Sequence, residues 1–167
     1  MSDNQPATPG DGATAGQPTP NIRLLAHYVR DLSFENVGAR EGTSADKAPE
    51  INVSVNLEAN NVGENRYHSI MKINATAKND AGTRFLIELE YCGVFQLENV
   101  QEQHVHIFVF TECPRLLLPF ARRVVSDVTR DGGYPPLLLD NIDFVQLYRQ
   151  RIQQMREAQA NQQAGTA

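Results

Sequence analysis

The segment C-P-R-L-L-L-P-F-A-R-R, residues 113–123, combines strong apolar helix formers with two prolines that stand five residues apart. Because each proline removes a backbone donor and clashes with the preceding helical turn, we expect a helix that bends or breaks near Pro114 and Pro119. No catalytic side chain accompanies the apolar residues 116–120. A bent, apolar helical segment in a chain with few chemical groups suggests a protein that works through its surfaces.

Helical periodicity extends beyond this segment. After Gln101 the apolar residues recur at helical spacing, and Gly132 and Gly133 are typical of a helix C-cap. The loop Y-P-P-L-L-L at 134–139 carries three leucines, which is unusual for a connector that should face water. A last helix is predicted from about Asp143, where Gln146 completes a capping-box pattern. This helix would present one apolar stripe, formed by Phe144, Leu147, Tyr148, Ile152 and Met155.

Four segments before the helices alternate between apolar and polar residues, which is typical of strands in a sheet with one solvated face. They lie at 22–35, 50–60, 67–78 and 83–98, and turn residues at 79–82 join the last two as a hairpin. Gly93 is expected to bend the last strand. The first segment is predicted to place Ile22, Leu24, Ala26, Tyr28, Leu32 and Phe34 on one face, and His27, Val29, Asp31, Ser33 and Glu35 on the other.

This order of elements predicts an α+β fold, a four-stranded antiparallel sheet with two helices packed on one face. The polar residues 36–49 would form a crossover loop. The other sheet face stays open and acidic, because Asp31, Glu35, Glu88 and Glu90 point to the same side in this register. The Pro- and Gly-rich residues 1–20 are expected to be a disordered tail, residues 21–155 the folded domain, and residues 156–167 a flexible tail.

Composition limits the classes of function. With 167 residues, 41% of them apolar, the chain can form one domain with a real core. Its net charge of -5 argues against binding to nucleic acid or anionic membranes, and residues 31–112 carry 13 acidic against 6 basic side chains, which favours a basic partner. Since neither a signal peptide nor a membrane-spanning run is found, we expect a cytoplasmic protein without direct membrane insertion. Cys92 and Cys113 lack a C-x-x-C pattern, so buried reduced thiols are expected.

The sequence gives little support to an enzyme. Motifs for nucleotide binding, serine hydrolysis and zinc proteolysis are absent. His104 and His106 could hold a metal in principle, but at helical spacing they point apart. Glu88 and Glu90 could form an acid/base pair, although an exposed face keeps carboxylates solvated, so a plain solvated face and a protein-docking patch both stay open. For the apolar block at 116–120, core packing or an oligomer interface is the simpler interpretation, whereas the leucines at 137–139 favour a groove.

Four segments together resemble the SecB family of protein-export chaperones. They are D-L-S-F-E at 31–35, F-L-I-E-L-E-Y-C-G-V-F at 85–95, C-P-R-L-L-L-P-F-A-R at 113–122 and G-G-Y-P-P-L-L-L at 132–139. The resemblance covers roughly residues 20–150, in order and without large gaps.

The resemblance implies a homotetramer, a dimer of dimers, with helices sandwiched between two sheets and acidic faces outward. It implies a chaperone that holds unfolded precursor proteins in the bacterial cytoplasm and passes them to SecA, the motor ATPase of the translocase. Such a protein is not an enzyme and uses no nucleotide, metal or other cofactor. By motif, the surface that receives the basic, zinc-bearing tail of SecA corresponds to Asp31, Glu35, Leu86 and Glu88.

A client groove is expected between the bent helix and the loop at 134–139. Its candidate lining residues are Phe110, Leu116, Leu117, Tyr134, Leu137 and Leu139. Two alternatives stay open beside this interpretation. One is an oligomeric adaptor whose apolar helix and loop are consumed by self-assembly, and the other is a small enzyme that uses Glu88, Glu90 and the histidines.

Overall fold

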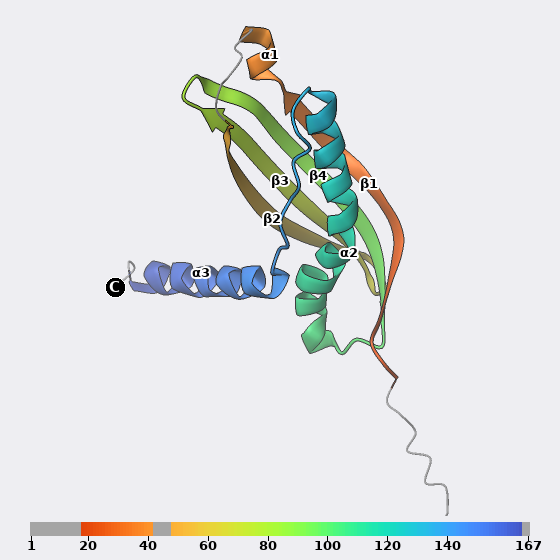
Figure 1. Ribbon diagram of the computed structural model, residues 1–167. Helices are drawn as coiled ribbons and strands as arrows, with labels where there is room; N and C mark the ends of the chain where they lie inside the picture. Colours follow the sequence, from red (N-terminus) through yellow and green to blue (C-terminus); the bar gives the residue numbers. More distant parts are fainter. Residues whose placement is uncertain (1–17, 42–47, 165–167) are drawn as a thin grey trace, which may run out of the picture.

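The computed structural model describes residues 18–41 and 48–164, and four antiparallel strands form its centre (Figure 1). They are β1 (Asn21–Glu35), β2 (Glu50–Gly63), β3 (Arg66–Asn79) and β4 (Gly82–Glu98), in the spatial order β1-β4-β3-β2. Helix α2 (Glu102–Asp131) lies along one face of this sheet (Figure 1). The predicted α+β fold with an antiparallel sheet is therefore confirmed. The predicted tail at 1–20 lies outside the described residues except for 18–20.

The alternating pattern of β2, β3 and β4 is confirmed by their pairing and burial. Residues that pair across neighbouring strands point to the same face, and the rows that face α2 contain most of the core. The core is less well covered at the edge strand β2, where Ile51 and Val53 remain 40% and 45% exposed. The buried members of these rows include Leu57, Met71, Ile73, Ala75, Ala77, Phe85, Ile87, Leu89, Tyr91, Phe95 and Leu97.

The predicted rows of β1 are wrong in the middle of the strand. The pairing of β1 with β4 shifts between Leu24 and Ala26 and again between Val29 and Asp31. Each shift inserts a residue, so the side chains between them exchange faces. His27 and Val29 consequently lie on the side of α2, while Ala26 and Tyr28 turn to the open face. The ring of His27 stacks on Phe120 of α2, with 4.1 Å between the ring centroids.

Helix α2 continues through both prolines, so the expected break is absent and only a bend remains. The 30-residue helix includes Pro114 and Pro119, and Figure 1 shows its axis changing direction partway along its length. The predicted C-cap is confirmed: the Gly132 amide donates to the Val128 carbonyl at 2.9 Å, and Gly133 adopts a φ of 85°.

A short helix, α1 (Val37–Glu41), occupies part of the segment predicted as a loop. Its first turn forms because Asn36 Oδ1 accepts a hydrogen bond from the Ala39 amide at 3.1 Å, which is N-cap geometry. The rest of the predicted crossover loop, residues 42–47, lies outside the described residues. The alternating patterns that predict strands give no signal for a single capped turn.

Helix α3 (Phe144–Ala164) begins as predicted, with the Gln146 amide donating to Asp143 Oδ1 at 3.0 Å. Only its first turns join the body, where Phe144 is buried and Leu147 and Tyr148 pack against the core. The rest projects away from the sheet (Figure 1), so two helices do not cover one face as expected. The helix also extends to Ala164, where a flexible tail is expected from residue 156. No helix in the described ranges has the length and apolar character needed to cross a membrane.

Gly93 provides space for α2 at the centre of the sheet. It pairs with Ser69 of β3 and His27 of β1 without a register shift at that position. A Cβ atom there would lie 2.6 Å from Leu117 Cδ2 and 2.8 Å from Phe95 Cε2, and both side chains are fully buried. The glycine expected to bend the strand therefore allows the helix to approach it closely.

Gly93→Ala should lower the free energy of unfolding by about 1–3 kcal/mol, because the added methyl group overpacks a core in which Leu117 has no room to move. Urea unfolding measures the change. Gly63→Ala is the matched control, since the nearest atom to its added Cβ is 3.7 Å away. A Gly93→Ala protein as stable as the control would contradict this packing.

Cys113 and Cys92 are free and buried, as expected. Burial raises the pKa of the Cys113 thiol from its ordinary value of 9.0 to about 12. Because the unfolded thiol ionises first as the pH rises, its contribution to stability is complete below pH 9 and is lost towards pH 12.

The urea midpoint should therefore fall more steeply between pH 7.5 and pH 10.5 in the native protein than in Cys113→Ala. Between these two pH values, the free energy of unfolding should fall by about 1–2 kcal/mol more in the native protein than in the variant. Other titrating groups are the same in both proteins, so their effects cancel in the comparison. Equal pH dependence in the two proteins would show that Cys113 ionises in the folded state.

Candidate functional site

The open face of the sheet carries an acidic strip along β1 and β4. Glu35 pairs with Leu86, Ser33 with Glu88 and Asp31 with Glu90, so the predicted acidic residues and Leu86 share one face. Asp31, Glu35 and Glu88 are exposed and Leu86 is half-buried. Within the part of the chain that the structure describes, no ion pair involves these three carboxylates.

Glu90 differs from its acidic neighbours because it lies in an ion network that crosses the sheet. Arg30 Nη2 lies 2.5 Å from Glu90 Oε2, and Lys72 Nζ lies 3.4 Å from Glu90 Oε1 and 2.6 Å from Glu58 Oε1. The hydrogen bond from Arg30 is the main cause that holds the pKa of Glu90 below its ordinary value. The same network raises the pKa of both Arg30 and Lys72. The negative strip therefore consists of Asp31, Glu35 and Glu88, while Glu90 is paired.

This arrangement does not fit an acid/base pair. A carboxylate whose pKa is lowered by cations stays ionised near neutral pH and is a poor proton donor. His104 and His106 lie on α2, across the sheet from Glu88 and Glu90, and His106 Nδ1 is 2.9 Å from the Tyr148 hydroxyl. Among residues 18–41 and 48–164, no three His, Cys, Asp or Glu side chains are grouped so that they could hold a metal ion.

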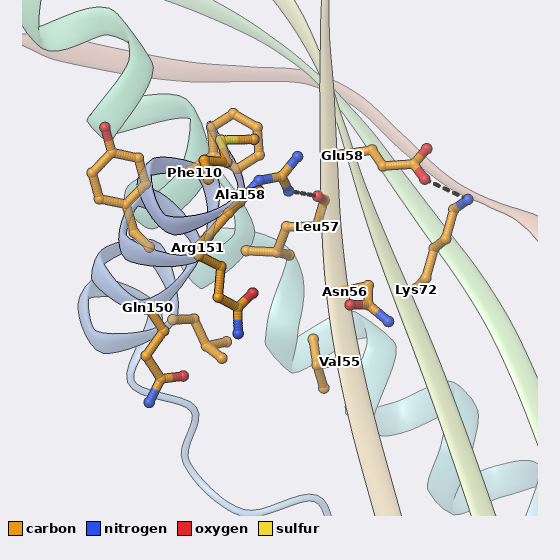
Figure 2. Close-up of a pocket in the computed structure, with 13 residues that line it drawn as sticks. Val55, Asn56, Leu57, Glu58, Lys72, Phe110, Gln150, Arg151 and Ala158 are labelled. Atoms are coloured by element: carbon orange, nitrogen blue, oxygen red, sulfur yellow. Dashed lines mark hydrogen bonds and ion pairs between the residues drawn. The ribbon is translucent and has the colours of Figure 1, made fainter. Parts of the chain in front are cut away.

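A cavity of about 770 Å³ opens between the edge strand β2 and helix α3 (Figure 2). Its apolar wall comes from the inner row of β2, from α2 and from the stripe of α3, and its remaining lining is polar. The apolar residues are Val55, Leu57, Phe110, Leu147, Tyr148, Met155 and Ala158. The polar and charged residues are Asn56, Glu58, Lys72, Gln150, Arg151 and Gln154.

Three contacts join α3 to α2 and β2 around this cavity. Arg151 reaches across from α3, donates a hydrogen bond to the Leu57 carbonyl of β2, and lies 4.8 Å from the centre of the Phe110 ring (Figure 2). His106 and Tyr148 join α2 to α3 at the same end. The lining therefore combines an apolar wall with a polar rim, and the apolar wall suits apolar side chains of varied shape.

Only Phe110 among the predicted groove residues lines this cavity. Leu117 is fully buried against Gly93, while Leu137 and Leu139 are 8% and 7% exposed in the core. The Tyr134 hydroxyl donates to Asn36 Oδ1 at 2.8 Å and is 3.0 Å from the Arg84 carbonyl oxygen. Leu116 is 43% exposed on α2. The six residues therefore do not line one groove within the protomer.

The residues that sequence reasoning missed carry two recognisable signals. Val55 and Leu57 belong to the predicted inner row of β2, and Tyr148 and Met155 to the predicted stripe of the last helix. The apolar row of β2 lies at the edge of the sheet, and α3 projects away from it, so no helix or strand covers this row completely. That excess of apolar surface over covering elements is the signal for the cavity.

Comparison with known proteins places this geometry in a family. Residues 15–155 match the family model of the preprotein translocase subunit SecB. The protein-export protein SecB of Ruegeria pomeroyi is 49% identical over 159 residues, covering 92% of this chain and 96% of that protein. The protein of the same name from a Jannaschia species is 50% identical over 175 residues and covers both chains completely.

A solved structure supports the fold. The Mycobacterium tuberculosis Rv1957 SecB-like chaperone, in complex with a ChAD peptide from the Rv1956 HigA1 antitoxin, superposes with a TM-score of 0.57 at 13% identity. The match covers 72% of this chain and 90% of that chain. With the family model and the relatives taken together, the chain belongs to the SecB family of protein-export chaperones.

Proposed function

We propose that this protein holds unfolded precursor proteins in the cytoplasm without ATP and delivers them to SecA. The cavity beside the edge strand β2 is the observation that carries the proposal, because apolar side chains of β2, α2 and α3 line it and Met155 of α3 is 46% exposed there. Burying one client Leu or Phe contributes about 1.5–3 kcal/mol, so each contact is loose and reversible. Anything that binds only the unfolded chain delays its folding by mass action.

A homotetramer, a dimer of dimers, would supply several such cavities to one client. Exposed apolar residues on the second edge strand support self-association: Leu25, Val29 and Leu32 of β1 are 45%, 41% and 40% exposed. This surface is separate from the cavity at β2, at the opposite edge of the sheet. Self-assembly through β1 would therefore leave the cavity open, which favours the chaperone over an adaptor that consumes its apolar surface.

The acidic strip is the proposed docking surface for the basic tail of SecA. Asp31, Glu35 and Glu88 provide three unneutralised carboxylates, and Leu86 provides an apolar contact between them. Charges on an exposed face mainly accelerate and orient binding, and salt weakens them. Because this strip lies on β1 and β4, and the cavity lies at the opposite edge strand β2, a client and SecA could be bound together.

The native protein should suppress aggregation of a denatured precursor on dilution, without ATP. Met155→Glu should weaken client binding about fivefold, because it places a charge on the apolar wall of the cavity, where Met155 is 46% exposed. Light scattering and fluorescence anisotropy measure the two effects.

Val62→Glu is the matched control for this experiment, since Val62 is 52% exposed on β2 and does not line the cavity. If neither an apolar dye nor a client titration detects accessible apolar surface on the intact oligomer, the adaptor alternative replaces the chaperone.

Glu35→Arg should weaken SecA binding about tenfold at low salt while the tetramer persists, because it reverses one of three charges on the strip. Calorimetric titration at two salt concentrations and sedimentation measure binding and assembly. Glu64→Arg, an equal charge change in the β2–β3 turn, should leave SecA binding intact. Unchanged affinity in Glu35→Arg at low salt would remove this face from the mechanism.

A further inference from the structure

A register shift in β1 brings a cation to one end of the acidic strip. The pairing of β1 with β4 shifts between Val29 and Asp31. Such a shift inserts one residue, so Arg30 and Asp31 together lie opposite Glu90. The Arg30 head group lies on the open face, with Nε 2.6 Å and Nη2 2.5 Å from Glu90 Oε2. Because two carboxylates directly opposite each other repel, Arg30 compensates the pairing of Asp31 with Glu90.

Arg30 compensates Glu90 more completely than Lys72 does. The guanidinium contacts one carboxylate oxygen through two nitrogens, and charge-assisted hydrogen bonds of this kind are short and strong. Lys72 Nζ lies 3.4 Å from the other oxygen of Glu90 but 2.6 Å from Glu58 Oε1 (Figure 2). Its charge is thus shared between two carboxylates. Removal of Arg30 would therefore leave Glu90 only partly compensated, with a net negative charge.

The position of Arg30 coincides with the end of the acidic strip. Along β4, the next residue on the open face after Glu90 is Cys92, which is buried beside Ile70 of β3. Neither of these two side chains offers a charge to a ligand. The unpaired carboxylates of the strip lie level with Glu90 or beyond it, towards Glu35. A basic ligand bound along the strip would therefore meet Arg30 where the negative charge ends.

We propose that Arg30 limits the affinity of the acidic strip for basic ligands, because it occupies the position at Glu90 that a ligand cation would otherwise take. This inference rests on the docking of the basic tail of SecA proposed above. The strip then offers three carboxylates to SecA although β1 and β4 supply four. A ligand cation that approaches Glu90 has to displace the guanidinium or is repelled by it. Arg30 is thus a repulsive element against ligands whose only attraction is positive charge.

Arg30→Gln should tighten the binding of SecA about threefold at about 0.1 M salt, because it frees one carboxylate on the strip. The gain should disappear at about 1 M salt, since the added attraction acts between exposed charges. Calorimetric titration of the full oligomer with SecA at the two salt concentrations measures both effects. Damage to the sheet would weaken binding, so a gain of affinity reports the freed charge.

Three further variants assign the gain to Glu90. Arg30→Lys keeps a cation beside Glu90 and should remove most of the gain. Glu90→Gln leaves Arg30 without its carboxylate and should weaken SecA binding about threefold at about 0.1 M salt. Combining Arg30→Gln with Glu90→Gln should return the affinity to the native value, because the carboxylate that Arg30→Gln frees is then absent.

Arg23→Gln is the matched control, because it breaks a similar ion pair on the same two strands and the same face. Arg23 Nη1 lies 3.5 Å from Glu98 Oε1. Glu98 follows Glu90 along β4 by about 26 Å, at about 3.3 Å per residue, which exceeds the screening length of about 10 Å at 0.1 M salt. The charge freed by Arg23→Gln should therefore leave SecA binding unchanged.

Native affinity in Arg30→Gln, or an equal gain in Arg23→Gln, would overturn the inference while the docking proposal stands. If the native protein does not bind SecA, or if Glu35→Arg binds SecA unchanged, the docking proposal fails and the inference fails with it.

Discussion

Leu117 packs where Gly93 has no side chain, and this contact sets the distance of α2 from the sheet. The loop after α2 is tied back to that helix through Thr129 and Arg122, so its position depends on the same packing. Helix α3 in turn starts from that loop and is braced against Phe110 of α2. A change in the separation of α2 from the sheet would therefore be transmitted to the cavity at the opposite end of the loop.

The two faces of the sheet differ in chemical character: the face under α2 is apolar, and the open face is charged. On the side of α2, apolar rows exceed what one helix can cover, and the uncovered remainder forms the cavity at β2 and the exposed strip at β1. On the open side, the network of Arg30, Glu90, Lys72 and Glu58 pairs charges across all four strands. This network leaves three carboxylates of the acidic strip without an ion pair among the described residues, those of Asp31, Glu35 and Glu88. The uncovered apolar surface and the unpaired carboxylates thereby lie on different parts of the sheet.

Alternation predicted the three strands at 50–98 well because the inner rows of β3 and β4 are buried and β2 pairs with β3 in register from Glu50 to Asn61. It failed in β1, where two register shifts move His27 and Val29 to the covered face, and such shifts leave no mark in an apolar pattern. The acidic strip was predictable because Asp31, Glu35 and Glu88 lie outside the shifted part. The groove residues were not, because Leu117, Leu137 and Leu138 are chemically identical and only tertiary packing decides which of them is exposed.

High affinity for an unfolded chain would have to come from several copies of the cavity that bind the same chain. The client contacts proposed for the cavity are apolar, so they would not demand a particular client sequence, and each contact alone would dissociate readily. If several protomers hold one unfolded chain, the second and later contacts form at an effective concentration set by the chain between them, which multiplies affinity without adding specificity. A folded client has no extended apolar segment to offer. Discrimination between unfolded and folded proteins then follows from the availability of the ligand.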